Sequence, residues 1–162
     1  MDKEARIVYT AGYRGIKAPD FAIWLKEEGV WKVIDVRRYR CRAPKGLYYG
    51  GSIIATLEQA GMKYLGFADK ESCLGNYQDT LDEYQDYLFT KHYDTIDYLA
   101  EMIMEQGKPV CFICAEKQPY EKGVAKCHRV FVADAVAKRL EAMTGEDWII
   151  EHLINPVKQE GE

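Results

Sequence analysis

Four kinds of reactive side chain bracket one loop in the second half of this chain. Cys114 and Glu116 follow the apolar run "VCFI", and Cys127, His128 and Arg129 precede the run "VFVADAV". A thiol can act as a nucleophile, a carboxylate or an imidazole can move protons, and a guanidinium can hold an anion. The concentration of these groups around one loop predicts a functional site there.

Zinc is one interpretation of this loop, because Cys114, Cys127 and His128 are ligand types that zinc accepts. Cys111 would not complete the site, since residues three apart on a strand lie about 10 Å apart and point to opposite faces. The same separation exceeds the roughly 7 Å Cα limit for a disulfide between Cys111 and Cys114. The zinc interpretation is therefore the weaker one, and we predict no metal and no cofactor.

Covalent catalysis by Cys114 is the second interpretation. A thiol at the end of a strand, facing the start of the next helix, lies where backbone N–H groups favour the thiolate. Glu116 could instead be the general acid or base, with Cys114 packed beside it. A structural interpretation also stands, in which Cys114 is buried and Glu116 forms an ion pair with Arg129. The residues alone leave these alternatives open.

A second stretch, "RRYRCRAPKGLYYGG", mixes basic and aromatic side chains. Arg37 and Arg38 could meet phosphates while the loop tyrosines stack on bases, although a solvated basic loop would look the same. The net charge of -4 and the pI near 5.5 argue against a protein that coats nucleic acid with an extended basic face. The remaining partners are a small anionic ligand, a nucleotide or a short nucleic-acid segment.

Alternating strands and helices must position these residues. Helical patterns, among them those around Phe21, Leu57, Leu99 and Val136, separate five strand-like runs: "RIVYT", "WKVIDV", "MKYLGF", "PVCFIC" and "DWIIEHL". A further acidic helix is expected near Leu88. The alternation predicts an α/β fold in which a mainly parallel sheet of about five strands lies between two helical layers, a Rossmann-like arrangement.

In such a fold the ligand crevice lies outside the carboxyl ends of the strands. The first strand leads into Tyr13, the second into Asp35 and Arg37, and the fourth into Cys114. We therefore expect these residues to converge at one edge of the sheet, with Tyr13 near the anion-binding arginines.

The chain of 162 residues has the length of one domain. We expect a single domain over 1–156 and a frayed tail over 157–162. The five cysteines are odd in number and irregularly spaced, which argues against an extracellular disulfide framework. No apolar stretch approaches the roughly 20 residues that would span a bilayer. These features predict a soluble, cytoplasmic protein and leave its oligomeric state open.

Several separated motifs together resemble the family known as domain of unknown function 488. They extend from about Ile7 to Leu153: "YTAGYRG", "VIDVRRYR", "GMKYLGF", "CLG", "VCFICAEK", "CHRVFVADAVA" and "EHL". The family is distantly similar to rhodaneses and cysteine phosphatases, Rossmann-like domains in which a strand-end cysteine meets an anion-binding loop. The resemblance thus implies a rhodanese-like fold.

The family pattern maps onto ten positions: Gly12, Asp35, Arg37, Arg38, Gly75, Cys114, Glu116, Cys127, His128 and Arg129. It implies tight turns at Gly12 and Gly75, an orienting role for Asp35 and a supporting role for Cys127. A cysteine phosphatase would need an arginine six residues after its nucleophile, where this chain has Tyr120. A rhodanese loop would close on the cysteine with backbone amides, whereas Glu116 follows here. Neither reaction carries over intact.

The sequence therefore predicts an enzyme that acts on an anionic substrate, either a nucleotide or a group derived from nucleic acid. A cysteine-dependent transferase or hydrolase fits the residue types. A non-catalytic nucleotide or nucleic-acid binding module and a structural scaffold are the alternatives. The predicted site has a catalytic set and an anion-binding set: Cys114, Glu116 and His128 in the first, and Tyr13, Arg37, Arg38 and Arg129 in the second.

Overall fold

The computed structural model describes residues 6–36, 50–66, 88, 90–114, 120–125 and 128–156. Its helices and strands follow one another as β1 (Ile7–Gly12), α1 (Ala18–Glu27), β2 (Lys32–Asp35), α2 (Gly50–Gln59), β3 (Lys63–Gly66), α4 (Tyr93–Gln106), β4 (Val110–Cys114), β5 (Tyr120–Glu121), β6 (Val124–Ala125), α5 (His128–Thr144) and β7 (Ile149–His152). The five strand-like runs of the sequence correspond to β1, β2, β3, β4 and β7.

Five of these strands form one sheet in the order β3-β2-β4-β1-β7, and every neighbouring pair is parallel. The chain therefore leaves the centre of the sheet after β1, builds one edge with β2 and β3, returns to the centre with β4 and ends at the other edge with β7. Helices occupy the crossovers, as parallel strands require. The predicted single α/β domain with a parallel five-stranded sheet is confirmed.

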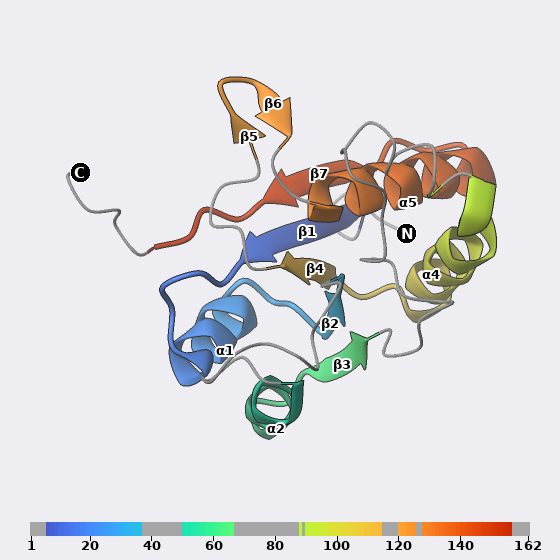
Figure 1. The fold of residues 1–162 in the computed structure, drawn as a ribbon. Coiled ribbons are helices and arrows are strands. Elements are labelled where there is room, and N and C mark those ends of the chain that lie inside the picture. Colours follow the sequence, from blue (N-terminus) through green and yellow to red (C-terminus); the bar gives the residue numbers. More distant parts are fainter. Residues whose placement is uncertain are drawn as a thin grey trace.

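Helices cover both faces of the sheet, which gives three layers (Figure 1). Val8, Phe112 and Cys114 belong to the buried cluster that includes side chains of α4 and α5. Ala11 and Cys111 belong to the opposite cluster, with side chains of α1 and α2. The expected placement of Cys111 and Cys114 on opposite faces is thus confirmed, because side chains alternate along a strand.

Local sequence signals explain where the helices begin and end. Pro19 lies in the first turn of α1, where a missing N–H costs nothing, and Phe21 and Leu25 form its buried stripe. Gly107 ends α4 in the left-handed conformation, with φ of 60°. None of the described helices is both long and apolar enough to cross a membrane.

A small antiparallel hairpin, β5–β6, lies in the segment between β4 and α5. Lys122 and Gly123 form its two-residue turn, and both have positive φ angles, of 51° and 79°. This pair of angles is typical of the tight turns that match the twist of two antiparallel strands. The acidic helix expected near Leu88 falls largely outside the described residues, and so does the expected frayed tail.

Candidate functional site

Cys114 ends the central strand β4 and pairs with Gly12 of β1 at the carboxyl edge of the sheet. Its side chain is 4% exposed and faces the layer of α4 and α5. Cys111, on the other face, is a free thiol that is completely buried. Burial raises the pKa of Cys111 far above its ordinary value, so this thiol is an inert part of the core.

Arg129 lies in the first turn of α5, and its side chain is completely buried. It precedes Val132, Ala133 and Val136, which are also buried, at the three- and four-residue spacing of one helix face. A guanidinium on such a face needs hydrogen-bonding partners, because a buried charge without them is costly. The Arg129 guanidinium therefore needs polar partners near the ends of the strands against which α5 packs, β1 and β4.

Two of its partners come from neighbouring strands. Nη1 of Arg129 donates a hydrogen bond to Sγ of Cys114 at 2.9 Å, and Nε donates to Oγ1 of Thr10 at 3.3 Å. Thr10 is completely buried on β1. Arg129 thus joins the ends of β1 and β4 to the start of α5.

The hydrogen-bonded chain continues from Thr10 to the edge strand. Thr10 pairs with His152 in the parallel register of β1 and β7, and Oγ1 of Thr10 is 2.6 Å from Nδ1 of His152. Since arginine has only donors, Thr10 accepts from Arg129 and can give its own hydroxyl proton to Nδ1. This assignment places the proton of the neutral His152 ring on Nε2.

His152 is half-buried, and its environment favours the neutral ring. Burial lowers the pKa of His152 below its ordinary value, and the charge of Arg129 lowers it further. The ring therefore remains neutral at pH 7, with a proton-bearing and a proton-accepting nitrogen. In this form it can donate to, or exchange a proton with, a bound molecule.

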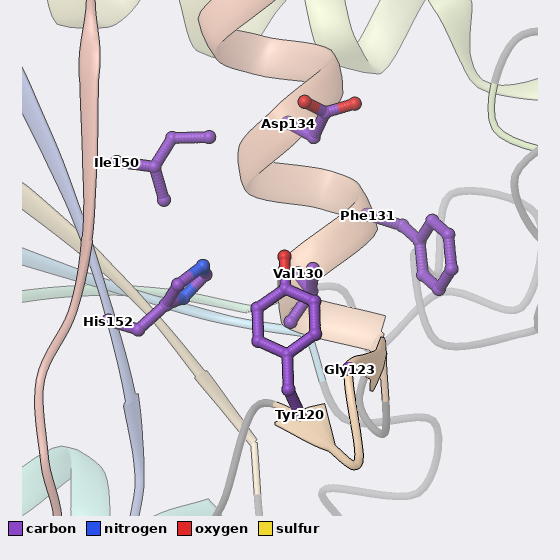
Figure 2. A pocket seen from close by; sticks show the side chains of 7 residues that line it. All are labelled: Tyr120, Gly123, Val130, Phe131, Asp134, Ile150 and His152. Carbon is purple, nitrogen blue, oxygen red and sulfur yellow. The ribbon is translucent and has the colours of Figure 1, made fainter.

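A cavity of about 370 Å³ opens beside His152 (Figure 2). It lies between the β5–β6 hairpin, the first turns of α5 and the strand β7. The described residues that line it are Tyr120, Gly123, Val130, Phe131, Asp134, Ile150 and His152. The ring of Tyr120 meets the His152 ring edge to face, with 5.5 Å between the ring centres. The cavity is therefore linked by hydrogen bonds through His152 and Thr10 to Arg129 and Cys114.

Cys114 is disulfide-bonded in this structure. The bond removes the thiol of Cys114, so nucleophilic chemistry at this sulfur requires reduction first.

The comparison with family models agrees with the motifs of the sequence. A model described as "Domain of unknown function DUF488" matches residues 17–136, which is most of the chain. The chain belongs to the DUF488 family. No curated protein and no solved structure matches it. The more distant likeness to rhodaneses and cysteine phosphatases stays a prediction.

The DUF488 match includes Cys114 and Arg129, but it does not include the other two residues of the hydrogen-bonded chain, Thr10 and His152. Thr10 lies before the matched residues, and His152 lies after them. Neither was among the predicted site residues, although His152 belongs to the motif "EHL". One signal could have identified them: each is a polar residue near the carboxyl end of a strand-like run.

Two predicted site residues of this DUF488 chain have side chains on the other face of the sheet from Cys114. Tyr13 is buried in the cluster with α1 and α2, and its ring meets Phe21 edge to face. Asp35 is also buried, and its carboxylate accepts a hydrogen bond of 2.5 Å from the hydroxyl of Tyr64. The strand ends converge as expected, but the sheet separates these two side chains from Sγ of Cys114.

The structure describes some of the remaining predicted residues and not others. Gly12 is buried at the end of β1, and its carbonyl accepts a hydrogen bond from the Asn155 amide at 2.9 Å. His128 begins α5 and is half-buried. Five predicted residues lie outside the described residues: Arg37, Arg38, Gly75, Glu116 and Cys127.

A metal site would need several ligating side chains close together. The described ranges contain no group of three or more histidine, cysteine or acidic side chains that could hold an ion. The zinc interpretation includes Cys127, which is not described, so the prediction that there is no metal stays untested.

Proposed function

We propose that this protein is a cysteine-dependent enzyme that acts on an anionic substrate, with Cys114 as the reacting group. One observation carries the proposal: the 2.9 Å hydrogen bond from Nη1 of Arg129 to Sγ of Cys114, formed between two buried side chains. A positive guanidinium beside a thiol favours the thiolate, which is the nucleophilic form of cysteine. Burial by itself disfavours a thiolate, so the proposal depends on the guanidinium of Arg129, whose charge water screens little in a buried place.

A transferase or hydrolase reaction fits this arrangement. The Cys114 thiolate would form a bond to an electrophilic atom of the substrate, and the leaving group would depart with its bonding electrons. Transfer of the bound group to water or to a second acceptor would then release the thiolate. His128 stays the predicted proton-transfer group at the start of α5, together with Glu116.

The substrate class follows from the charges predicted around the site. Arg37 and Arg38 stay the predicted contacts to an anionic group, such as the phosphate of a nucleotide or of a short nucleic-acid segment. Arg129 is completely buried, so we assign it to the thiolate of Cys114 and not to direct binding of the anion.

The disulfide at Cys114 defines a condition for this activity. The enzyme would be active after a thiol reductant has reduced this bond, through a mixed disulfide that a second thiol resolves. The cytoplasm keeps most protein thiols reduced, so we propose that the protein works there.

Alkylation of the reduced protein tests the nucleophile. Rates of modification by iodoacetamide are measured for each cysteine by mass spectrometry between pH 5 and pH 10. We expect Cys114 to be modified at half its maximal rate well below the ordinary thiol pKa of about 8.5, while Cys111 stays unmodified as an internal control. Arg129→Lys keeps the charge near the sulfur, whereas Arg129→Met should shift the profile of Cys114 upward.

Two results would contradict this proposal. Cys114 could have the profile of an ordinary thiol, or it could stay unmodified in the folded protein. The second result counts because a substrate must reach the same sulfur that the small reagent reaches.

Replacing iodoacetamide with iodoacetate tests whether the site attracts anions, as an anionic substrate requires. Iodoacetate carries a negative charge and iodoacetamide does not, so the ratio of their rates measures attraction of anions to the site. We expect this ratio to be higher for Cys114 than for glutathione in the same buffer, and to fall as salt screens the attraction. A ratio equal to or below that of glutathione would argue against an anionic substrate.

A binding module without catalysis is the second candidate. The disulfide bond at Cys114 favours it, because a disulfide sulfur is not a thiolate nucleophile. This function requires saturable nucleotide affinity that falls with salt and survives Cys114→Ser. Loss of that affinity in Cys114→Ser would contradict this second candidate.

A further inference from the structure

We infer that the cavity beside His152 binds an uncharged heteroaromatic ring that carries an amino group, as in the nucleobase adenine. The inference rests on the proposed function, since it names the part of a nucleotide substrate that enters this cavity. The volume of about 370 Å³ lies within the range of small-molecule binding sites.

Four of the seven described residues that line the cavity have apolar or aromatic side chains (Figure 2). Val130 and Phe131 come from α5, Ile150 from β7 and Tyr120 from the hairpin. Such side chains favour a flat ring, which stacks on or meets other rings edge to face. Tyr120 is 45% exposed, so its ring stands at the mouth of the cavity, where a ligand can reach it.

Two polar side chains line the cavity from different sides, and each can form a hydrogen bond with a ligand. Asp134 lies on α5, and one of its carboxylate oxygens is 3.0 Å from Nζ of Lys138. A carboxylate has about four acceptor positions, so it can accept a further hydrogen bond from an amino group of a ligand. His152 on β7 uses Nδ1 for Thr10, which leaves Nε2 with its proton as the donor to an acceptor on the ring.

The charge of the lining selects the part of a nucleotide that can enter. None of the seven described lining residues is lysine or arginine, and one of them is an aspartate. The Asp134 carboxylate can accept a hydrogen bond from an amino group, whereas an ionised phosphate offers it no donor. The ring therefore enters the cavity, and the anionic groups of the same substrate remain outside it.

The hydrogen-bonded chain connects this cavity with the reacting sulfur. A ring that contacts His152 lies two hydrogen-bonded side chains, Thr10 and Arg129, away from Cys114. The inference thus places the recognised ring and the reacting group of one substrate beside opposite ends of the same buried cluster.

Adenosine and inosine test the inference, because they differ at one exocyclic position and at the ring nitrogen beside it, which accepts in adenosine and carries a proton in inosine. Adenosine carries an amino group there, and inosine carries a carbonyl oxygen that Asp134 would repel. We expect calorimetry to show saturable binding of adenosine, and binding of inosine at least about tenfold weaker, the effect of losing one good hydrogen bond. The ring resonances of His152 should shift on addition of adenosine.

Matched variants locate the site. Asp134→Asn should remove the preference for adenosine, because an amide can donate to inosine as well as accept from adenosine. Asp97→Asn is the control, since the Asp97 side chain is 38% exposed against 39% for Asp134, and it also pairs with a basic residue of α5. Tyr120→Ala should weaken adenosine binding, and Tyr98→Ala, at an exposed tyrosine of α4, should not.

Three results would overturn the inference: no saturable binding of adenosine, equal affinity for the two nucleosides, or a preference that Asp134→Asn leaves intact. The alkylation profile of Cys114 distinguishes this failure from failure of the proposed function. If adenosine binds but Cys114 behaves as an ordinary thiol, the cavity stands and the enzyme does not. If Cys114 reacts as proposed but adenosine does not bind, only the cavity inference is lost.

Discussion

Thr10 and His152 are neighbours across the β1–β7 pairing, and the Thr10 hydroxyl oxygen is 2.6 Å from Nδ1 of His152. The same oxygen accepts a hydrogen bond from Nε of Arg129. One buried hydroxyl therefore stands between a guanidinium that contacts Cys114 and an imidazole that lines the cavity. It couples the two parts of the candidate site.

Thr10→Val keeps the shape of the side chain and removes this hydroxyl. The variant should unfold with a free energy lower by about 1–3 kcal/mol, because Arg129 and His152 lose a partner in a buried place. If Thr10 donates to Nδ1, its removal should also raise the pKa of His152, since the hydroxyl stabilises the neutral ring. Urea denaturation and an NMR titration of His152 measure the two effects.

Thr95→Val, at a half-buried threonine of α4, is the control for the Thr10 variant and should leave both quantities unchanged. A pKa of His152 that falls in Thr10→Val would show that Thr10 accepts from Nδ1, and would contradict the proton assignment given above.

Arg129→Lys retains a positive charge but loses the forked shape of the guanidinium. A lysine ammonium cannot bond Thr10 and Cys114 from two separate nitrogens. We expect a loss of about 1.5–3 kcal/mol in the free energy of unfolding, the usual contribution of a hydrogen bond to a charged group. Arg139→Lys, on the exposed side of α5, should change it by less than about 0.5 kcal/mol. Equal losses in the two variants would count against a special role for Arg129.

The fold was accessible from the sequence because its elements are regular. Parallel strands that are buried on both faces, such as "VCFIC", appear in the sequence as short apolar runs. Helices with one buried stripe separate these runs. The β5–β6 hairpin was not predicted, since each of its strands has only two residues and leaves no periodic signal. A glycine such as Gly123 is typical of a turn, but a turn alone does not predict pairing.

The candidate site was predictable in part. The chain order placed Cys114 at the carboxyl edge of the sheet, and two-residue alternation separated it from Cys111. The same helical spacing that buries Val132 and Val136 would have indicated that Arg129 faces the core. The contact between Thr10 and His152 depends on the register of two strands that are far apart in the sequence, and a single sequence does not determine that register.

Mild acid should destabilise the protein through its buried histidines. Burial lowers the pKa of His92 and of His152, and Arg129 lowers that of His152 further. Thr10 and Tyr120 also contact His152, and Asp134 lines the same cavity. As the pH falls through the unfolded value of about 6.5, the unfolded chain binds protons that the folded chain does not, so the free energy of unfolding falls.

Urea denaturation at several values between pH 8 and pH 5.5 measures this loss. The stability conferred by the neutral rings is fully present above about pH 6.5 and declines below it. The double variant His92→Gln, His152→Gln should show a flatter dependence on pH over this range. A dependence as steep as that of the unaltered protein would mean that other groups are responsible.

Tyr64→Phe separates the role of Asp35 from that of Cys114. The variant removes the hydroxyl that donates to the buried Asp35 carboxylate, so the free energy of unfolding should fall by about 1.5–3 kcal/mol. The alkylation profile of Cys114 should not change, because the sheet separates the two side chains. Tyr93→Phe, at an exposed tyrosine of α4, controls for loss of a hydroxyl in water. A slower reaction of Cys114 in Tyr64→Phe alone would place Asp35 in the chemistry, acting across the sheet through the β2–β4 pairing.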